Sequence, residues 1–386
     1  MMTIMPILAI GTLAASVENI GPVAFRKDLQ FHRDFQFTVA KKLIQFIIVI
    51  GLALVWRDYR ALMVSTVFGC IASTALSYAL HPFRPKWSLA KATEIWGFSF
   101  RLAAINFASY ANANAEKLVI GRVVGAEQTG IYYVGDEIAE MPYSELVAPT
   151  SRVTVPGFAK IKHDPDRLKS AVLKVLGFVA LFSIPASAGL VLVSQNLVTV
   201  LLGPRWIAAA GVIQLCAISA GFCALYSIFG NLLVVLGRLN ITMLATYIHA
   251  LLFVALLSPV VWHYGILGAA GLKGALAAVT FVVYGWLGSR ALQTSMQELI
   301  AVLWRPLASA MLMVCVCLSV AELFPSPAAA LTCQVTIGIA CYGAASYVIW
   351  LASGYPDGAE RDLLELALGR VRSLRATFSM LLRYRN

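Results

Sequence analysis

The chain has 386 residues, of which 60% are hydrophobic and only 13% are charged. A soluble globular protein carries about a quarter charged residues, so the composition excludes a disordered chain and argues against a set of soluble domains. We therefore expect an all-α, polytopic transmembrane helix bundle, because apolar stretches of ~20 residues cross the hydrocarbon core as helices. The net charge of +11 is attributed to membrane orientation, and no nucleic-acid partner is expected.

Apolar stretches punctuated by Pro, Gly and charged residues follow one another along the whole chain, and eleven of them are candidate spans. In chain order they cover residues 1–20, 37–56, 61–80, 97–115, 130–149, 172–193, 211–236, 241–261, 266–287, 306–323 and 328–351.

The basic residues predict how these spans are oriented. Lys and Arg concentrate in alternate connections, including residues 26–42, residues 152–174 and the tail after Gly354. Because such residues collect on the cytoplasmic side, we expect a cytoplasmic C-terminus. Eleven spans would then place Met1 outside. Either residues 1–20 do not span the membrane, or an odd number of helices is missing upstream.

Patterns for metal, nucleotide or hydrolytic chemistry are absent from the sequence. The seven cysteines lie in apolar stretches without a CxxC pair, and the five histidines are scattered, so no metal site is expected. The sequence has no P-loop, HExxH motif or nucleophile elbow. We expect no cofactor and no enzyme activity, and an energy source other than ATP, such as a proton or sodium gradient.

The best-marked stretch, residues 115–164, carries a family resemblance. It contains an acidic-basic pair followed by a glycine turn, a G-h-Y element, and a long EIA…ELVAP…PGFAK run. These elements comprise Glu116, Lys117, Ile120, Gly121, Arg122, Gly125, Gly130, Ile131, Tyr132, Glu137, Ile138, Ala139, Pro142, Glu145, Leu146, Val147, Ala148, Pro149, Arg152, Pro156, Gly157, Phe158, Ala159 and Lys160. The stretch resembles polysaccharide (oligosaccharide-lipid) flippases of the multidrug/oligosaccharidyl-lipid/polysaccharide exporter superfamily. The turn at Leu202–Trp206 is also similar to that family.

The resemblance implies a two-lobe exporter of fourteen helices, here with an incomplete first lobe. Residues 1–80 would be a three-helix remnant of the N-terminal lobe, and residues 81–96 a cytoplasmic linker. Residues 97–288 would form a complete six-helix C-terminal lobe. Residues 304–352 would add two helices, and residues 353–386 a basic cytoplasmic tail. Aligned this way, residues 1–20 take the place of the fourth helix, and we expect an N-terminal truncation or a misplaced start.

Charged residues inside the candidate spans are the candidate site. Asp136, Glu137 and Glu140 fall on one helical face, and carboxylates in hydrocarbon should face a cavity or a partner. Arg101 and Lys273 could offset the charge of a lipid diphosphate. The alternatives are that the carboxylates pair with nearby cations or lie near a hydrated surface. In the same way, Arg101 could snorkel to the interface, and Lys273 could pair with a carboxylate of another span.

The resemblance implies a flippase that moves polyprenyl-pyrophosphate oligosaccharide across a bacterial inner membrane, for exopolysaccharide, capsule or O-antigen assembly, by alternating access. Its partners would be the lipid-linked substrate, membrane lipids and, further, a polysaccharide polymerase and export proteins. Three alternatives stay open: a membrane-embedded polymerase or glycosyltransferase, a drug or cation antiporter of the same superfamily, and a non-functional truncated flippase.

Overall fold

A computed structural model describes residues 4–28, 30–57, 59–80, 82–84, 92–321, 326–354 and 361. Within these ranges every regular element is a helix, which confirms the all-α prediction. The chain divides into two compact units, Met1–Trp96 and Gly97–Asn386. Nearly all of the predicted basic tail and half of the predicted linker lie outside the described residues, and the predicted domain boundaries stay predictions.

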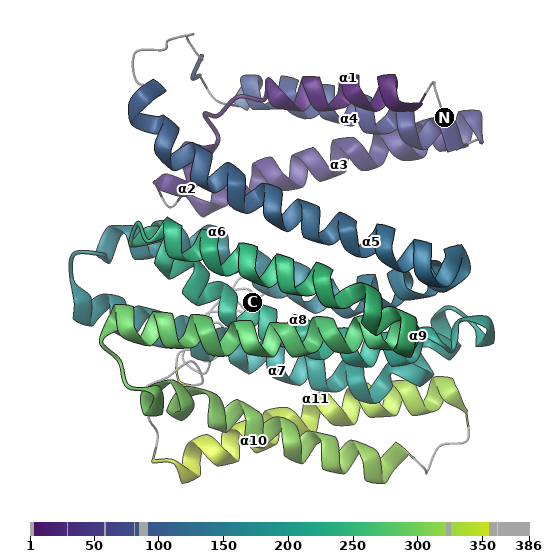
Figure 1. The fold of residues 1–386 in the computed structure, drawn as a ribbon, viewed down its shortest axis with the longest axis vertical. Helices are drawn as coiled ribbons and strands as arrows, with labels where there is room; N and C mark the ends of the chain where they lie inside the picture. Colours follow the sequence, from purple (N-terminus) through teal and green to yellow (C-terminus); the bar gives the residue numbers. More distant parts are fainter. Residues whose placement is uncertain are drawn as a thin grey trace, which may run out of the picture. The chain divides into compact units, whose positions relative to one another are not determined.

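Three long helices and one short one make up the described part of the first unit. These are α1 (Ile4–Ser16), α2 (Val23–Lys27), α3 (Phe31–Trp56) and α4 (Tyr59–Leu80). Helix α4 packs against both α1 and α3 (Figure 1). Because α3 and α4 are apolar over most of their length, they associate through close packing and hydrogen bonds rather than through the exclusion of water.

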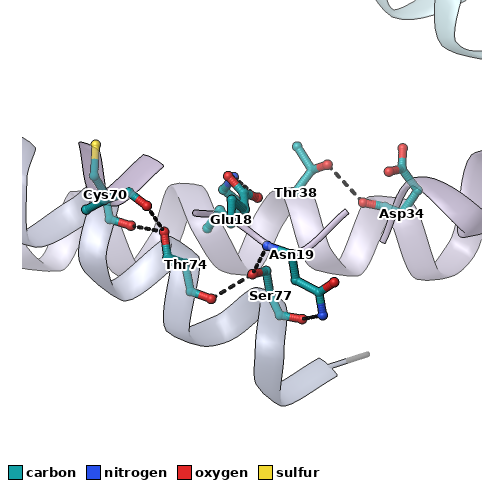
Figure 2. Close-up of polar contacts among 9 residues, drawn as sticks. Glu18, Asn19, Asp34, Thr38, Cys70, Thr74 and Ser77 are labelled. Atoms are coloured by element: carbon teal, nitrogen blue, oxygen red, sulfur yellow. Dashed lines mark hydrogen bonds and ion pairs between the residues drawn. The ribbon is translucent and has the colours of Figure 1, made fainter. Parts of the chain in front are cut away.

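Small polar side chains join α1 to α4 at one end of this unit. The backbone amide of Asn19 donates to Ser77 Oγ at 3.0 Å, and the Thr74 hydroxyl donates to the Ala14 carbonyl at 2.8 Å. Figure 2 shows Asn19 next to Ser77, with Thr74 one turn earlier on α4. A bidentate contact of Lys41 Nζ with Glu18, at 2.7 and 3.0 Å, links the same end to α3. These contacts satisfy polar groups inside an apolar unit.

The second unit contains the remaining helices. They are α5 (Ala92–Pro142, whose first residues precede the unit boundary), the π-helix η1 (Tyr143–Val147), α6 (Ala148–Ile161), α7 (Pro165–Leu201), the 3₁₀-helix η2 (Pro204–Trp206), α8 (Ala209–Val235), α9 (Leu239–Leu292), α10 (Met296–Ala321) and α11 (Pro327–Ala352).

Helix α8 is the centre of this unit. It packs against α7 and α9, and α10 and α11 pack on each other and on α7 (Figure 1). Phe229, Leu232 and Leu233 of α8 are buried in the main apolar cluster. Gly288 of α9 allows that helix to approach α8 closely, because a Cβ there would lie 3.0 Å from Phe229 Cε1. Small residues at such crossings are typical of membrane helices.

Helices α5 and α9 are hairpins rather than single rods. Each contains one glycine with positive φ, Gly125 at 84° and Gly265 at 62°. His249 Nδ1 and Thr280 Oγ1 are 2.8 Å apart, although 31 residues of continuous helix would separate them by ~47 Å. The two arms of α9 therefore run antiparallel. The Tyr132 hydroxyl hydrogen-bonds to Glu116, which requires the same reversal in α5.

Six helices in the described part of the chain are long and apolar enough to cross a membrane. They are α3, α7, α8, α9, α10 (over Met296–Val320) and α11. This confirms a multi-span membrane protein. The predicted stretches 241–261 and 266–287 are the two arms of α9, while 97–115 and 130–149 lie on the two arms of α5, the second continuing through η1 into α6. The total of eleven spans stays a prediction.

Candidate functional site

Three of the predicted charged residues form an ion cluster between the second arms of α5 and α9. Lys273 Nζ lies 2.6 Å from Asp136 Oδ1 and 2.9 Å from Glu140 Oε1. Asp136 and Glu140 are four residues apart and therefore share a helical face, so one ammonium group bridges both. Paired in this way, the three charges can remain inside apolar spans.

The position of the cluster follows from the two glycine reversals. Lys273 is eight residues beyond Gly265, and Asp136 is eleven residues beyond Gly125. At 1.5 Å per residue these offsets correspond to ~12 and ~16 Å along the helix axes. The two turns are on the same side of the unit, since Ile120, Tyr132, Val261 and Ile266 share one apolar cluster. The ion cluster thus lies well inside the spans.

A carboxylate–phenol pair, Glu116 and Tyr132, continues from the ion cluster toward the glycine turns, and together these groups form a polar stripe. Glu116 accepts a hydrogen bond from Tyr132, and both are buried, with exposed fractions of 8% and 0%. Tyr132 is one helical turn before Asp136, and Glu116 interacts electrostatically with Lys273. The side-chain exposure rises along the stripe, reaching 16% at Asp136 and 50% at Glu140. The end of the stripe at Glu140 is therefore accessible, and the end at Glu116 and Tyr132 is buried.

Sequence reasoning missed the role of Glu116 and Tyr132. Glu116 falls one residue beyond the predicted span 97–115 and was interpreted there only as part of a charged pair beside a turn. The signal in the sequence was its four-residue spacing from the apolar Ile120, which places both on one helical face. In the structure Ile120 is fully buried, so that face points inward.

The other two predicted site residues do not join the cluster. Glu137, which was expected to share a face with Asp136 and Glu140, is about 100° around the helix from Asp136. Its side chain is exposed and is not one of the partners of Lys273. In the described part of the chain its carboxylate makes no hydrogen bond or ion pair. Arg101 lies at the far end of the first arm of α5, where its Nη1 donates to Asn240 Oδ1 at 3.2 Å. The structure thus gives Arg101 an amide partner rather than a carboxylate.

A separate apolar cavity of about 820 Å³ opens between α7, α10 and α11. Its walls are mostly aliphatic and aromatic, with Gln334 among the few polar residues. Asn196 Nδ2 donates to Gln334 Oε1 at 3.0 Å, and the Tyr342 hydroxyl donates to the Leu181 carbonyl at 2.8 Å. These bonds engage Gln334 and Tyr342, and most of the remaining wall is apolar, which gives a surface suited to hydrocarbon.

Comparison with solved structures shows what class of protein has this architecture. The chain superposes on a structure described as "Lipid II flippase MurJ, inward closed conformation" with a TM-score of 0.66. The match covers 90% of this chain and 72% of the other at 14% identity, so the chain is a multi-span membrane protein with that fold.

The sequence comparisons give the family. The family model described as "Polysaccharide biosynthesis protein" matches residues 1–211, and the chain belongs to that family.

Curated relatives agree with this assignment. The lipopolysaccharide biosynthesis protein WzxC of Escherichia coli K12 is 27% identical over 59% of this chain, which spans only 47% of WzxC. The teichuronic acid biosynthesis protein TuaB of Bacillus subtilis 168 is 24% identical, with 91% of this chain and 73% of TuaB covered. The succinoglycan biosynthesis transport protein ExoT of Rhizobium meliloti 1021 is 24% identical, over 96% of this chain and 75% of ExoT.

Proposed function

We propose that the protein is a flippase that carries polyprenyl-pyrophosphate-linked oligosaccharide across the bacterial inner membrane during polysaccharide assembly. The observation that carries this proposal is the Lys273–Asp136–Glu140 cluster, an ionic group held inside spans of a fold shared with a lipid flippase. Charges kept inside a membrane mark a transport pathway more often than a scaffold.

The family and its relatives support the substrate class. The names of WzxC, TuaB and ExoT place those proteins in lipopolysaccharide, teichuronic acid and succinoglycan biosynthesis. The name of ExoT adds transport. A lipid-linked oligosaccharide has a polar head and a hydrocarbon chain. The polar stripe suits the head group, and the apolar cavity between α7, α10 and α11 offers room for part of the hydrocarbon chain.

Energy coupling is the second part of the proposal. The ion cluster and the adjoining Glu116 together have three carboxylates, those of Glu116, Asp136 and Glu140, against the one ammonium of Lys273. Such a site gains a cation at low electrostatic cost. We propose that a proton or sodium gradient drives transport and that these carboxylates respond to it. Collapsing each gradient separately with an ionophore, while export is followed in cells, tests which ion is used.

The decisive experiment is deletion of the gene followed by complementation. If the protein is a flippase, its loss lowers surface polysaccharide and leaves complete lipid-linked repeat units in the membrane, protected inside spheroplasts from an added glycosidase. Accumulation of incomplete repeat units would instead indicate a glycosyltransferase. Single repeat units on the outer face would indicate a polymerase. Normal polysaccharide with altered drug resistance would indicate an antiporter.

A matched pair of variants tests the site. Asp136→Asn removes the charge that contacts Lys273, and Glu137→Gln removes a neighbouring exposed charge of the same kind. We expect Asp136→Asn to lower export about tenfold or more, since losing ~1.4 kcal/mol is a factor of ten. Glu137→Gln should retain wild-type export at equal membrane levels. Equal export by both variants would remove the cluster from the transport pathway.

A further inference from the structure

Arg101 and Lys273, the two cations predicted at the site, lie at different depths along the helices of the second unit. Arg101 is 24 residues before Gly125, and its partner Asn240 is 25 residues before Gly265. Both offsets correspond to ~36 Å of helix, whereas Lys273 is only ~12 Å from its glycine turn. A diphosphate group is far shorter than the ~24 Å difference, so it cannot contact both cations at once.

The two cations also differ in how far their charge is already compensated. Lys273 faces two carboxylates at 2.6 and 2.9 Å, and Glu116 acts on it as well. The sum of these charges is negative, so the cluster repels an anion while its carboxylates are ionised. Arg101 has only an uncharged amide partner, Asn240, among the described residues. Its positive charge therefore remains available.

The local geometry at Arg101 fits an anion. A guanidinium group has five N–H donors in a planar fork, and in the described structure one of them, on Nη1, is used by Asn240. The Arg101 Nε atom is buried without a hydrogen-bond partner in the described part of the chain. The guanidinium lies over Gly97, where a Cβ would be 3.6 Å from Nη2, so no side chain from that residue covers it. A buried donor without a partner is costly, and a bound phosphate oxygen would satisfy it.

We propose that the corner formed by Arg101 and Asn240 is the site that first receives the diphosphate group of the lipid-linked substrate, separate from the Lys273 cluster. This inference rests on the proposed flippase function for the identity of its substrate. On the orientation predicted from the basic connections, the corner is at the cytoplasmic end of the spans, where such a lipid is made available. Arg101 binds the diphosphate through paired N–H···O bonds, and the Asn240 amide orients the guanidinium.

Direct binding measurements test the corner without requiring transport. The full chain is placed in phosphatidylcholine nanodiscs, and the affinity for inorganic pyrophosphate and farnesyl pyrophosphate is measured by titration calorimetry. We expect Arg101→Ala to weaken both affinities at least ~tenfold, since a charge-assisted hydrogen bond contributes that much. Arg101→Lys should recover part of the affinity, because it keeps the charge and loses the fork. Asn240→Ala should cause a smaller loss.

Arg122 supplies the matched control. It is an exposed arginine near the other end of the same arm of α5, and Arg122→Ala should bind both probes as the wild type does. If Arg101→Ala and Arg122→Ala bind equally well, or if the wild type binds neither probe, Arg101 is an interfacial anchor and the proposal is wrong. A second set of binding measurements uses nanodiscs that also contain phosphatidylglycerol. Complete competition by that lipid would assign the corner to a phospholipid headgroup and also overturn the proposal.

The outcome for the proposed function is read separately, from glycan export in cells. Pyrophosphate binding that depends on Arg101, in a chain whose deletion leaves export intact, would keep the anion site and remove the flippase function. Export that requires the protein but tolerates Arg101→Ala, with unchanged pyrophosphate affinity, would remove the anion site and keep the flippase.

Discussion

Tyr132 donates its hydroxyl hydrogen to Glu116 across the reversal at Gly125, and this bond ties the two arms of α5 together inside the spans. Tyr132 is fully buried and Glu116 nearly so. The bond satisfies two polar groups at once, and it fixes the face on which Asp136 meets Lys273. The geometry of the ion cluster therefore depends on the neighbouring hydrogen bond between Tyr132 and Glu116.

Removing the Tyr132 hydroxyl should destabilise the protein. We expect Tyr132→Phe to lower the free energy of unfolding by about 1–3 kcal/mol, because a buried carboxyl group loses its hydrogen-bond donor. The melting temperature of the purified protein in detergent measures the effect. Tyr264→Phe is the control, since Tyr264 is 74% exposed and its hydroxyl makes no hydrogen bond in the described structure. Equal melting temperatures for the two variants would show that the Tyr132 bond contributes nothing.

The close approach of α8 and α9 gives a prediction about packing. Gly288→Ala places a Cβ against the Phe229 ring, with Phe229 Cε1 only 3.0 Å away, and both helices must shift. We expect a loss of about 1–3 kcal/mol, as in other overpacked interiors. Gly285→Ala is the matched control on the same helix, because a Cβ there meets nothing within 4 Å. Thermal stability in detergent compares the two. An equal loss from both would point to backbone effects of glycine replacement instead.

Much of this site could be predicted from the sequence, because a charged residue inside an apolar span is easy to recognise. Asp136, Glu140 and Lys273 each interrupt an apolar stretch. An unpaired charge in hydrocarbon is costly, so each of these side chains needs a partner. The pairing of Lys273 with carboxylates of another span was one of the two interpretations considered, and the structure shows it. It does not exclude a transport role, since a paired charge can still exchange partners.

The missing parts of the site depend on chain reversals and distant contacts. A helical pattern does not show where a continuous helix folds back, and Glu116 falls one residue beyond the predicted span 97–115. In the structure Glu116 lies within a helical arm that continues to Gly125 and accepts a hydrogen bond from Tyr132. The Arg101–Asn240 contact joins residues 139 positions apart, and no local spacing encodes such a pair.

Topology can be checked with reporter fusions. A reporter after Asn386, or within residues 160–169, should report the cytoplasm, because these segments lie in or beside the Lys- and Arg-rich connections. One inserted within residues 325–328 should report the outside, since that connection contains no Lys or Arg. Dual alkaline phosphatase and green fluorescent protein fusions measure both states. A cytoplasmic signal from the 325–328 insertion would overturn the predicted set of spans.

The ion cluster makes the last prediction, which concerns charge balance. Lys273→Met leaves Asp136 and Glu140 facing each other without a cation, and these side chains are 16% and 50% exposed. Removing one member of a buried pair costs about 3–5 kcal/mol, and the partial exposure of Glu140 should reduce that cost. We expect a lower membrane level and a broadened peak in fluorescence-detected size exclusion.

Adding Asp136→Asn to Lys273→Met should restore much of the membrane level. Of the two carboxylates that contact Lys273, only the more exposed one, Glu140, then remains without its cation. Glu137→Gln in the same background should restore nothing, since the Glu137 side chain is exposed and lies on another face of the helix. Recovery by Asp136→Asn together with lost export would separate folding from transport. It would show that the cluster is needed for movement of the substrate and not merely for assembly of the helices. Equal recovery by Asp136→Asn and Glu137→Gln would instead reflect total charge, and the specific Lys273–Asp136 contact would have no role in stability.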